Sequence, residues 1–130
     1  MSVFLSLDFL YIPCRDVDDA AARLVEQLGA ELVWKVRGMG TVVACVRPSA
    51  EGPLLLLSGH LAGEAPILVY RVADHADTVA RLRASGLDLR TLEIPHGPCS
   101  SFEAGGQRLA VYELVRPAAG EYFAGRIDEP

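Results

Sequence analysis

The residues best suited to chemistry in this sequence lie in the segment IPHGPCSSF, residues 94–102, where His96 and Cys99 are three positions apart. A histidine beside a cysteine can take the thiol proton and create a thiolate nucleophile. The flanking prolines and glycine predict a stiff, tightly turned loop. Three interpretations stay open for this segment: a structural turn, a contact to a bound ligand, or a catalytic pair without an evident orienting acid.

The size and charge of the chain restrict what such residues could serve. The sequence has 130 residues, about one domain, and 51% of them are hydrophobic, enough for a core without covalent crosslinks. The formal net charge is −5, which argues against a nucleic-acid partner, because phosphates require a basic face. No apolar run approaches the roughly 20 residues that cross a bilayer, so we expect no membrane partner.

The cysteines indicate the compartment. Cys14, Cys45 and Cys99 are odd in number, far apart and outside any CxxC pair, so neither a zinc ribbon nor a disulfide framework is predicted. Free thiols are typical of a reducing cytosol. The N-terminal MSVFLSLDFLYIPC lacks the basic region and cleavage site of a signal peptide. We therefore expect a cytoplasmic protein.

The chain contains an internal repeat. Residues 9–27 align without a gap to residues 67–85, and after one deletion Gly29 matches Gly86. The gap-free identities include an aspartate at the end of a strand-like run and an apolar pattern typical of a helix. They are Leu10/Leu68, Asp16/Asp74, Asp19/Asp77, Ala22/Ala80, Arg23/Arg81 and Leu24/Leu82.

Each repeat predicts the same order of elements. A strand (7–14 or 66–72) leads to an aspartate that can cap a helix, and a glycine ends that helix. Three strands follow in each half, predicted at 32–36, 41–48, 53–59, 88–94, 99–104 and 107–115. This βαβββ order, written twice, indicates the α+β class with helices segregated to one face. We divide the single domain into module one (about 5–60), module two (about 65–116) and a tail (117–130).

The tail carries Tyr122, Phe123 and Ile127 after a proline break. Two interpretations stay open: a strap packed on its own domain, or an arm that reaches across a partner in a homodimer.

Tandem βαβββ modules resemble the vicinal oxygen chelate superfamily, which includes glyoxalase I, bleomycin-resistance proteins and extradiol dioxygenases. The resemblance covers residues 8–116, and its most specific parts are the strand-then-aspartate openings and the closing FEAGGQRLAVYELVRP. It implies that the two modules pair into a cup-shaped mixed sheet with the helices outside, and that small molecules bind inside the cup.

The resemblance also implies where a metal would be held. Metal-using members place one ligand on each of four strands, and the matching positions here are Phe9, Ile67, Ala110 and one residue of Leu54–Leu57. None of these side chains offers a lone pair to a divalent ion. The nearest donors, Asp8 and Glu113, are one residue away, and a one-residue slip points a side chain to the opposite face. We therefore predict no metal and no cofactor.

Alternation from Phe9 then predicts an apolar, aromatic cup with a few polar tips, a composition usual for a small-molecule site. The predicted ligand-binding residues are Phe9, Tyr11, Trp34, Ile67, Val69, Arg71, His96, Cys99, Arg108, Ala110 and Tyr112. The alternatives are that the arginines lie in solvent, that the tyrosines and Trp34 fill a core, and that His96 and Cys99 belong to a structural turn.

Three functions follow from this reading. The first is a metal-independent protein, a homodimer, that holds a small hydrophobic or aromatic molecule, with no catalytic residues. The second is a lyase, isomerase or dioxygenase with a displaced site built from Tyr11, Tyr112, His96 and Arg71. The third is a structural or regulatory dimer whose cup is filled by its own side chains.

Overall fold

The structure is a computed structural model, and it describes residues 2–121 and 123–130. The chain divides into two compact units. One contains residues 9–66 together with residues 123–130, and the other contains residues 2–8 together with residues 67–121. Each unit is described separately below. No helix in the described residues is long and apolar enough to cross a membrane.

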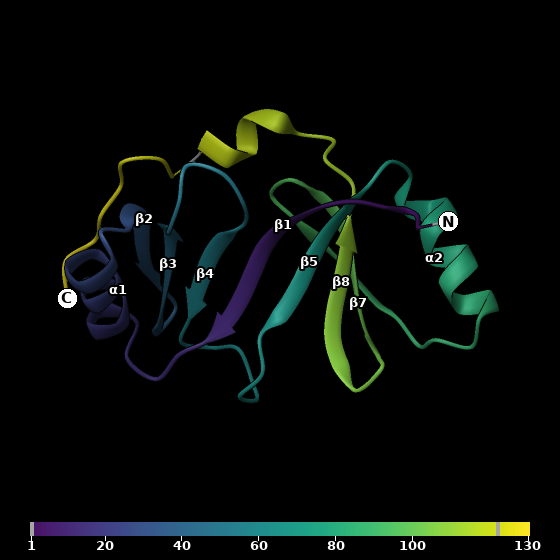
Figure 1. The fold of residues 1–130 in the computed structure, drawn as a ribbon, viewed down its shortest axis with the longest axis horizontal. Coiled ribbons are helices and arrows are strands. Elements are labelled where there is room, and N and C mark those ends of the chain that lie inside the picture. The colour runs from purple at the N-terminus through teal and green to yellow at the C-terminus, as the bar shows by residue number, and fades with distance from the viewer. Residues whose placement is uncertain (1, 122) are drawn as a thin grey trace. The chain divides into compact units, whose positions relative to one another are not determined.

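The first module has the order β1 (Phe4–Pro13), α1 (Val17–Leu28), β2 (Glu31–Gly38), β3 (Thr41–Arg47) and β4 (Leu54–Ser58). Its strands lie side by side as β2-β3-β4-β1. The β2-β3 and β3-β4 pairs are antiparallel, whereas β1 and β4 are parallel. Figure 1 shows α1 packed against the β2–β4 part of this sheet, which matches the contacts between them.

The second module repeats that order with β5 (Ile67–Val72), α2 (His75–Ala84), β6 (Arg90–Ile94), β7 (Gly97–Ala104) and β8 (Gln107–Tyr112). Its strands lie as β5-β8-β7-β6, and β5 and β8 form the parallel pair. A short 3-10 helix, η1 (Pro117–Glu121), follows. The α+β class and the duplicated βαβββ order are thereby confirmed.

Both helices begin where the repeated residues predict, and α1 also ends at its predicted glycine, whereas α2 (His75–Ala84) is capped by Ser85, one residue before Gly86. The Asp16 carboxylate accepts a hydrogen bond from the Asp19 amide at 3.0 Å, and Asp74 accepts one from Asp77 at the same distance. Such a cap stabilises a helix by about 1 kcal/mol. Gly29 ends α1 in the left-handed conformation, at a φ of 70°.

Each helix covers its own hydrophobic core. Ile12 and Cys14 of the first module pack against the core under α1. The buried members of this core are Val17, Ala21, Ala30, Ala44, Val46 and Leu57. The buried core beneath α2 consists of Val72, Val79, Leu89, Phe102 and Val111. In each module the sheet therefore has one face on its helix and one face turned away from it.

The tail lies along the outer edge of β2 in its own chain. The Lys35 amide donates to the Arg126 carbonyl at 2.8 Å, and the Lys35 carbonyl accepts from the Asp128 amide at 2.8 Å. Phe123 packs on Trp34 with ring centroids 5.4 Å apart. Residues 123–128 thus form a strap on their own chain; Tyr122 lies outside the described residues.

Candidate functional site

The positions that match the metal-binding positions of the family carry carbon-only side chains. Phe9 is 8% exposed and Ala110 is 3% exposed. Tyr11 and Val69 are equivalent positions of the two repeats. In the strand register Tyr11 lies opposite Leu56 and Val69 lies opposite Ala110, so Leu56 is the counterpart of Ala110. Within the described part of the chain, no three His, Cys, Asp or Glu side chains are grouped so as to hold a metal ion. The donor set therefore does not fit a metal.

Several polar side chains of the unit that contains residues 67–121 meet at Asp8. The Tyr112 hydroxyl donates a hydrogen bond to the Asp8 carboxylate, and Ser6 donates another at 2.6 Å. Arg71 forms an ion pair with the same carboxylate, Nε to Oδ2, at 3.2 Å. Strict alternation along β1 predicted that Asp8 would point away from Arg71 and Tyr112. That expectation is wrong, because the carboxylate contacts both side chains.

His96 joins this cluster, named here the Asp8 cluster (Asp8, Arg71, His96 and Tyr112). Its ring lies edge-on to the Tyr112 ring with centroids 5.9 Å apart. Burial lowers the pKa of His96 below its ordinary value, and the nearby Asp8 carboxylate opposes that shift only in part. A neutral imidazole at physiological pH can accept a proton or a hydrogen bond.

Tyr112 is the buried centre of the Asp8 cluster. Its side chain is 2% exposed. Burial is the main cause that raises the pKa of its hydroxyl, and the hydrogen bond to Asp8 adds to it. Tyr112 therefore stays a protonated donor. The Arg71 side chain is 39% exposed, against 19% for the Asp8 side chain, so Arg71 is open to solvent.

Cys99 does not form a reactive pair with His96. The thiol is 9% exposed, and burial raises its pKa to about 11. It is protonated at neutral pH, whereas nucleophilic attack needs the thiolate. Cys99 lies opposite Tyr112 in the strand register. A buried, protonated thiol is poorly suited to covalent chemistry.

The loop that carries His96 is a tight turn between β6 and β7. The His96 carbonyl accepts hydrogen bonds from the Val115 and Arg116 amides, both at 3.0 Å. Gly97 faces the Glu113 carbonyl so closely that any Cβ there would overlap it. The turn thus fixes His96 against the chain that leaves β8.

Ile67 and Arg108 lie apart from the Asp8 cluster. They are opposite each other in the register of β5 and β8. Both line an open pocket of about 570 Å³. Its other charged lining residues are Asp88, Arg90 and Glu103. The mixed charges give this pocket no single preferred ligand sign.

Two predicted aromatic residues lie in the other unit. The half-buried Trp34 is packed by Phe123 of the tail, so part of its ring surface is already covered. Tyr11 is half-buried and lies edge-on to His60, with centroids 6.4 Å apart. No spacing pattern in the sequence marks His60 as part of a site.

His75, the first residue of α2, is buried, with 9% of its surface exposed. Its Nε2 lies 2.7 Å from the hydroxyl of the fully buried Ser100. This contact places His75 in the interior below α2, where it stabilises the fold rather than a ligand.

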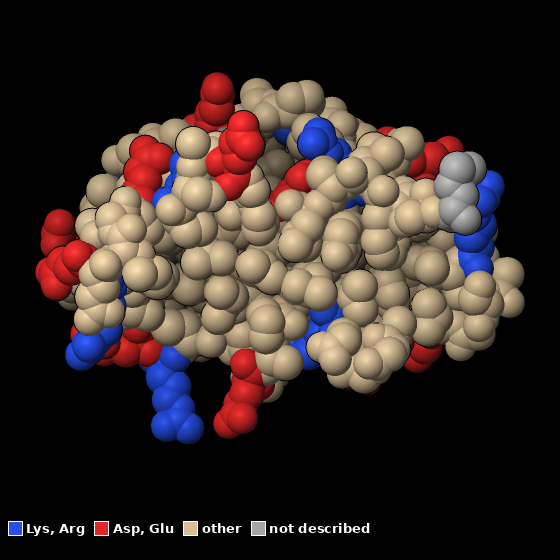
Figure 2. Space-filling model, in the orientation of Figure 1, with Lys and Arg blue, Asp and Glu red and all other residues tan. Residues whose placement is uncertain are grey.

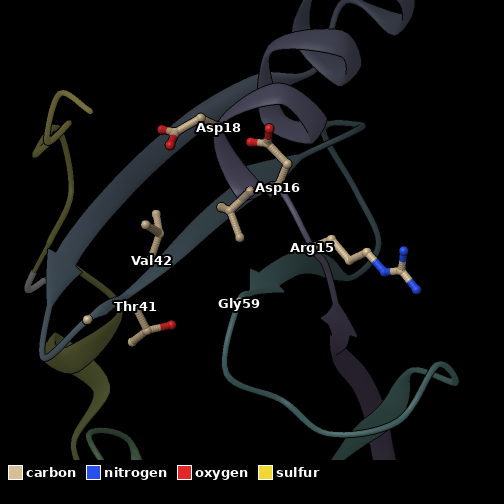
Figure 3. Close-up of a pocket in the computed structure, with 8 residues that line it drawn as sticks. Arg15, Asp16, Asp18, Thr41, Val42 and Gly59 are labelled. Carbon is tan, nitrogen blue, oxygen red and sulfur yellow. The ribbon is translucent and has the colours of Figure 1, made fainter.

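A smaller pocket of about 250 Å³ lies at the start of α1. Figure 3 shows Asp16 and Asp18 at the helix start, Thr41 and Val42 on β3, and the Arg15 guanidinium pointing away from them. Asp16 caps the helix and Asp18 pairs with Lys35 at 2.7 Å and with Arg37. Both carboxylates therefore already serve the fold.

On the face that Figure 2 shows, acidic and basic side chains are mixed among large uncharged areas.

The chain was compared with known proteins. No family model matches it, and no curated protein matches it. Solved structures do match. Methylmalonyl-CoA epimerase from Mycobacterium tuberculosis is 20% identical with a TM-score of 0.74, covering 92% of this chain and 95% of that one. A second methylmalonyl-CoA epimerase structure is 16% identical with a TM-score of 0.71, covering 89% and 99%.

A further match is a variant of the Streptomyces coelicolor methylmalonyl-CoA epimerase in complex with 2-nitronate-propionyl-CoA. It is 14% identical with a TM-score of 0.69, covering 86% of this chain and 96% of that one. At these identities the likeness establishes the fold. These epimerases are members of the superfamily that the duplicated sequence resembles. The chain has the fold of the vicinal oxygen chelate superfamily.

Proposed function

We propose that this protein binds a small hydrophobic or aromatic molecule without the help of a divalent metal ion. The observation that carries the proposal is the set of side chains at the four matching positions, Phe9, Leu56, Ile67 and Ala110. Carbon-only side chains favour an apolar ligand and leave no site for a Lewis acid.

Polar contacts would come from the Asp8 cluster, whose Tyr112 is on the same strand as Ala110. Arg71 is held by Asp8 and partly exposed, so it can meet a polar group of the ligand without a large loss of side-chain entropy. His96 offers a neutral ring nitrogen. A few placed polar groups on an apolar surface are the usual composition of a specific small-molecule site.

The test combines a metal assay with a ligand screen. Less than a tenth of an equivalent of metal should co-purify, and added Zn²⁺, Mn²⁺ or Fe²⁺ should not raise the melting temperature. A ligand at 100 times its Kd adds about 2.7 kcal/mol of stability, a shift on the order of 10 °C for a chain of this size. Stoichiometric metal, or no stabilising molecule among aromatic acids, phenols and acyl-CoA esters, would contradict the proposal.

A second candidate function is a metal-independent isomerase, and the Asp8 cluster is the observation that favours it. The cluster joins a neutral histidine, a protonated tyrosine, a carboxylate and a guanidinium. The matched structures include a methylmalonyl-CoA epimerase bound to methylmalonyl-CoA. An epimerase must remove and return a proton at one carbon, and a neutral imidazole near pH 7 is suited to that transfer.

Exchange of substrate hydrogen tests this candidate. Methylmalonyl-CoA incubated with the protein in D2O should gain deuterium at the carbon between its carbonyl groups, and mass spectrometry would record the gain. His96→Gln should lower the exchange rate at least a hundredfold, since general base catalysis contributes about that much. Exchange no faster than in buffer would remove this candidate and leave the binding function.

A further inference from the structure

A second polar cluster lies in the unit that contains residues 9–66. The fully buried Ser58 places its Oγ 2.9 Å from Nδ1 of His60. On the other side of the ring, Nε2 of His60 lies 3.4 Å from the Tyr11 hydroxyl oxygen. The imidazole therefore stands between a buried hydroxyl and a half-buried phenol.

This cluster borders an apolar part of its sheet. On β1, Phe9 and Tyr11 point to the face opposite to that of Ile12, which packs under α1. On β4, Leu54 and Leu56 likewise alternate with Leu55 and Leu57, which pack under α1. The register places Phe9 opposite Leu54 and Tyr11 opposite Leu56. These four side chains therefore share the face turned away from α1, and the Tyr11 hydroxyl is the polar end of that surface.

The hydrogen bonds around Ser58 indicate which nitrogen of His60 carries the proton. The Ser58 oxygen accepts from the His60 amide at 3.3 Å, so one of its lone pairs is in use. Its own proton can then be donated to Nδ1, the shortest side-chain contact that the ring makes. With Nδ1 as an acceptor, a neutral ring carries its proton on Nε2 and donates it toward Tyr11.

We propose that Ser58 fixes His60 as the Nε2–H tautomer, so that the Tyr11 hydroxyl proton is presented to an acceptor oxygen of an apolar ligand. Because the Tyr11 oxygen accepts from His60, its proton remains for an outside acceptor. The ligand class is an aromatic or aliphatic molecule with a carbonyl or carboxylate oxygen. Ser58 is a positioning residue, and Tyr11 is the residue that touches the ligand.

The ligand part of this inference rests on the proposed binding function, whereas the tautomer part does not. Nitrogen-15 NMR of histidine-labelled protein reads the tautomer directly, without any ligand. We expect His60 to show a protonated Nε2 and a bare Nδ1, and Ser58→Ala to convert it to a mixture of tautomers. A proton on Nδ1 in the unmodified protein would overturn the proposal.

Thr41 supplies the matched control for the tautomer. Its hydroxyl also faces Nδ1, but at 3.4 Å. If Ser58 sets the tautomer, Thr41→Val should leave the nitrogen shifts of His60 unchanged. An equal effect of Thr41→Val and Ser58→Ala would contradict the assignment to Ser58.

The ligand part is tested with benzoate as the probe and benzylamine, which lacks an acceptor oxygen, as its control. Benzoate should shift the His60 and Leu56 resonances and bind Tyr11→Phe about tenfold more weakly, the usual loss for a hydrogen bond to a charged group. Tyr70→Phe, on a tyrosine stacked on Phe4 in the other unit, should bind benzoate normally. Equal binding of benzoate to Tyr11→Phe, or none to the unmodified protein, overturns the ligand assignment.

These outcomes separate the inference from the proposed function. Suppose a molecule from the thermal-shift screen stabilises the unmodified protein and Tyr11→Phe equally. The binding function then stands and the role of Tyr11 fails. If no molecule in the screen binds, the binding function fails, and the NMR measurement still decides whether Ser58 sets the His60 tautomer.

Discussion

The Tyr112 hydroxyl donates a hydrogen bond to the carboxylate of Asp8, although the two residues are 104 positions apart in the chain. This contact links the first strand of the sequence to the last one. Because the Asp8 carboxylate also receives Ser6 and faces Arg71, removing one donor leaves a partly buried charge with fewer partners.

Tyr112→Phe tests the strength of that link. We expect a loss of about 1–3 kcal/mol in the free energy of unfolding, since the partly buried Asp8 carboxylate loses one of its hydrogen-bond donors. Urea denaturation followed by circular dichroism measures it. Tyr70→Phe, which keeps its ring stacked on Phe4, is the control and should change stability by less. Equal losses in the two variants would show that the Asp8 contact adds nothing.

Asp8→Asn should lower the pKa of His96 further. Burial lowers the pKa of His96 and the Asp8 charge raises it, so removing that charge should let burial lower the pKa more. A proton NMR titration of the His96 ring measures the shift, and Asp88→Asn, on the rim of the 570 Å³ pocket, is the control. A rise in the His96 pKa would show that Asp8 does not stabilise the imidazolium.

The lowered pKa of His96 also gives the stability a pH dependence with a definite sign. At a pH between the lowered pKa of His96 in the folded protein and its ordinary pKa in the unfolded chain, the unfolded chain binds more protons. The free energy of unfolding therefore falls as the pH drops through the ordinary histidine range. Urea midpoints at pH 7.5 and pH 5.5 should show this loss. In His96→Gln the difference between the two urea midpoints should be smaller. An unchanged difference would contradict the assignment of this pH dependence to His96.

Gly97→Ala should be among the most destabilising single-methyl changes in the chain. A Cβ at this position would overlap the Glu113 carbonyl, which is backbone and cannot turn aside. We expect a loss of about 2 kcal/mol or more, the size of other overpacking effects. Gly38→Ala, which meets nothing within 4 Å, is the matched control and should be close to neutral. Thermal melts of the two variants would settle the comparison.

The three thiols should react at different rates with a disulfide reagent. Burial raises the pKa of Cys45 and of Cys99 to about 11, whereas Cys14 is half-buried and its pKa is raised less. In native protein at pH 8 we expect Cys14 to react first and the other two only after unfolding. Cys14→Ser should abolish the early phase. An early phase that survives in this variant would contradict the burial of Cys99.

The sequence predicted the repeated parts of this molecule well. Asp16, Asp74 and Gly29 act locally, through hydrogen bonds and backbone conformations within a few residues, so a local pattern is enough to place them. The hairpin at Gly105 and Gly106 has positive φ at both residues, as such a two-residue turn requires.

The contacts of the polar cluster were harder to predict because they join segments that are distant in sequence. Period-two alternation gave the wrong side for Asp8, since its contacts with Arg71 and Tyr112 do not follow a strict pleat. The surroundings of His60 and His75 were hard to predict for a related reason. Their positions depend on the buried hydroxyls of Ser58 and Ser100, which local sequence patterns do not reveal.

The strap formed by residues 123–128 has a consequence for the lifetime of the protein in solution. An open sheet edge can pair with the edge of another molecule and start aggregation. Here the backbone groups of Lys35 are occupied by the strap, and Asp128 accepts the Arg37 amide at 2.8 Å. A protease that removed only the last eight residues would leave both cores intact. It would, however, expose the edge of β2, which could then pair with strands of other molecules and start fibre formation.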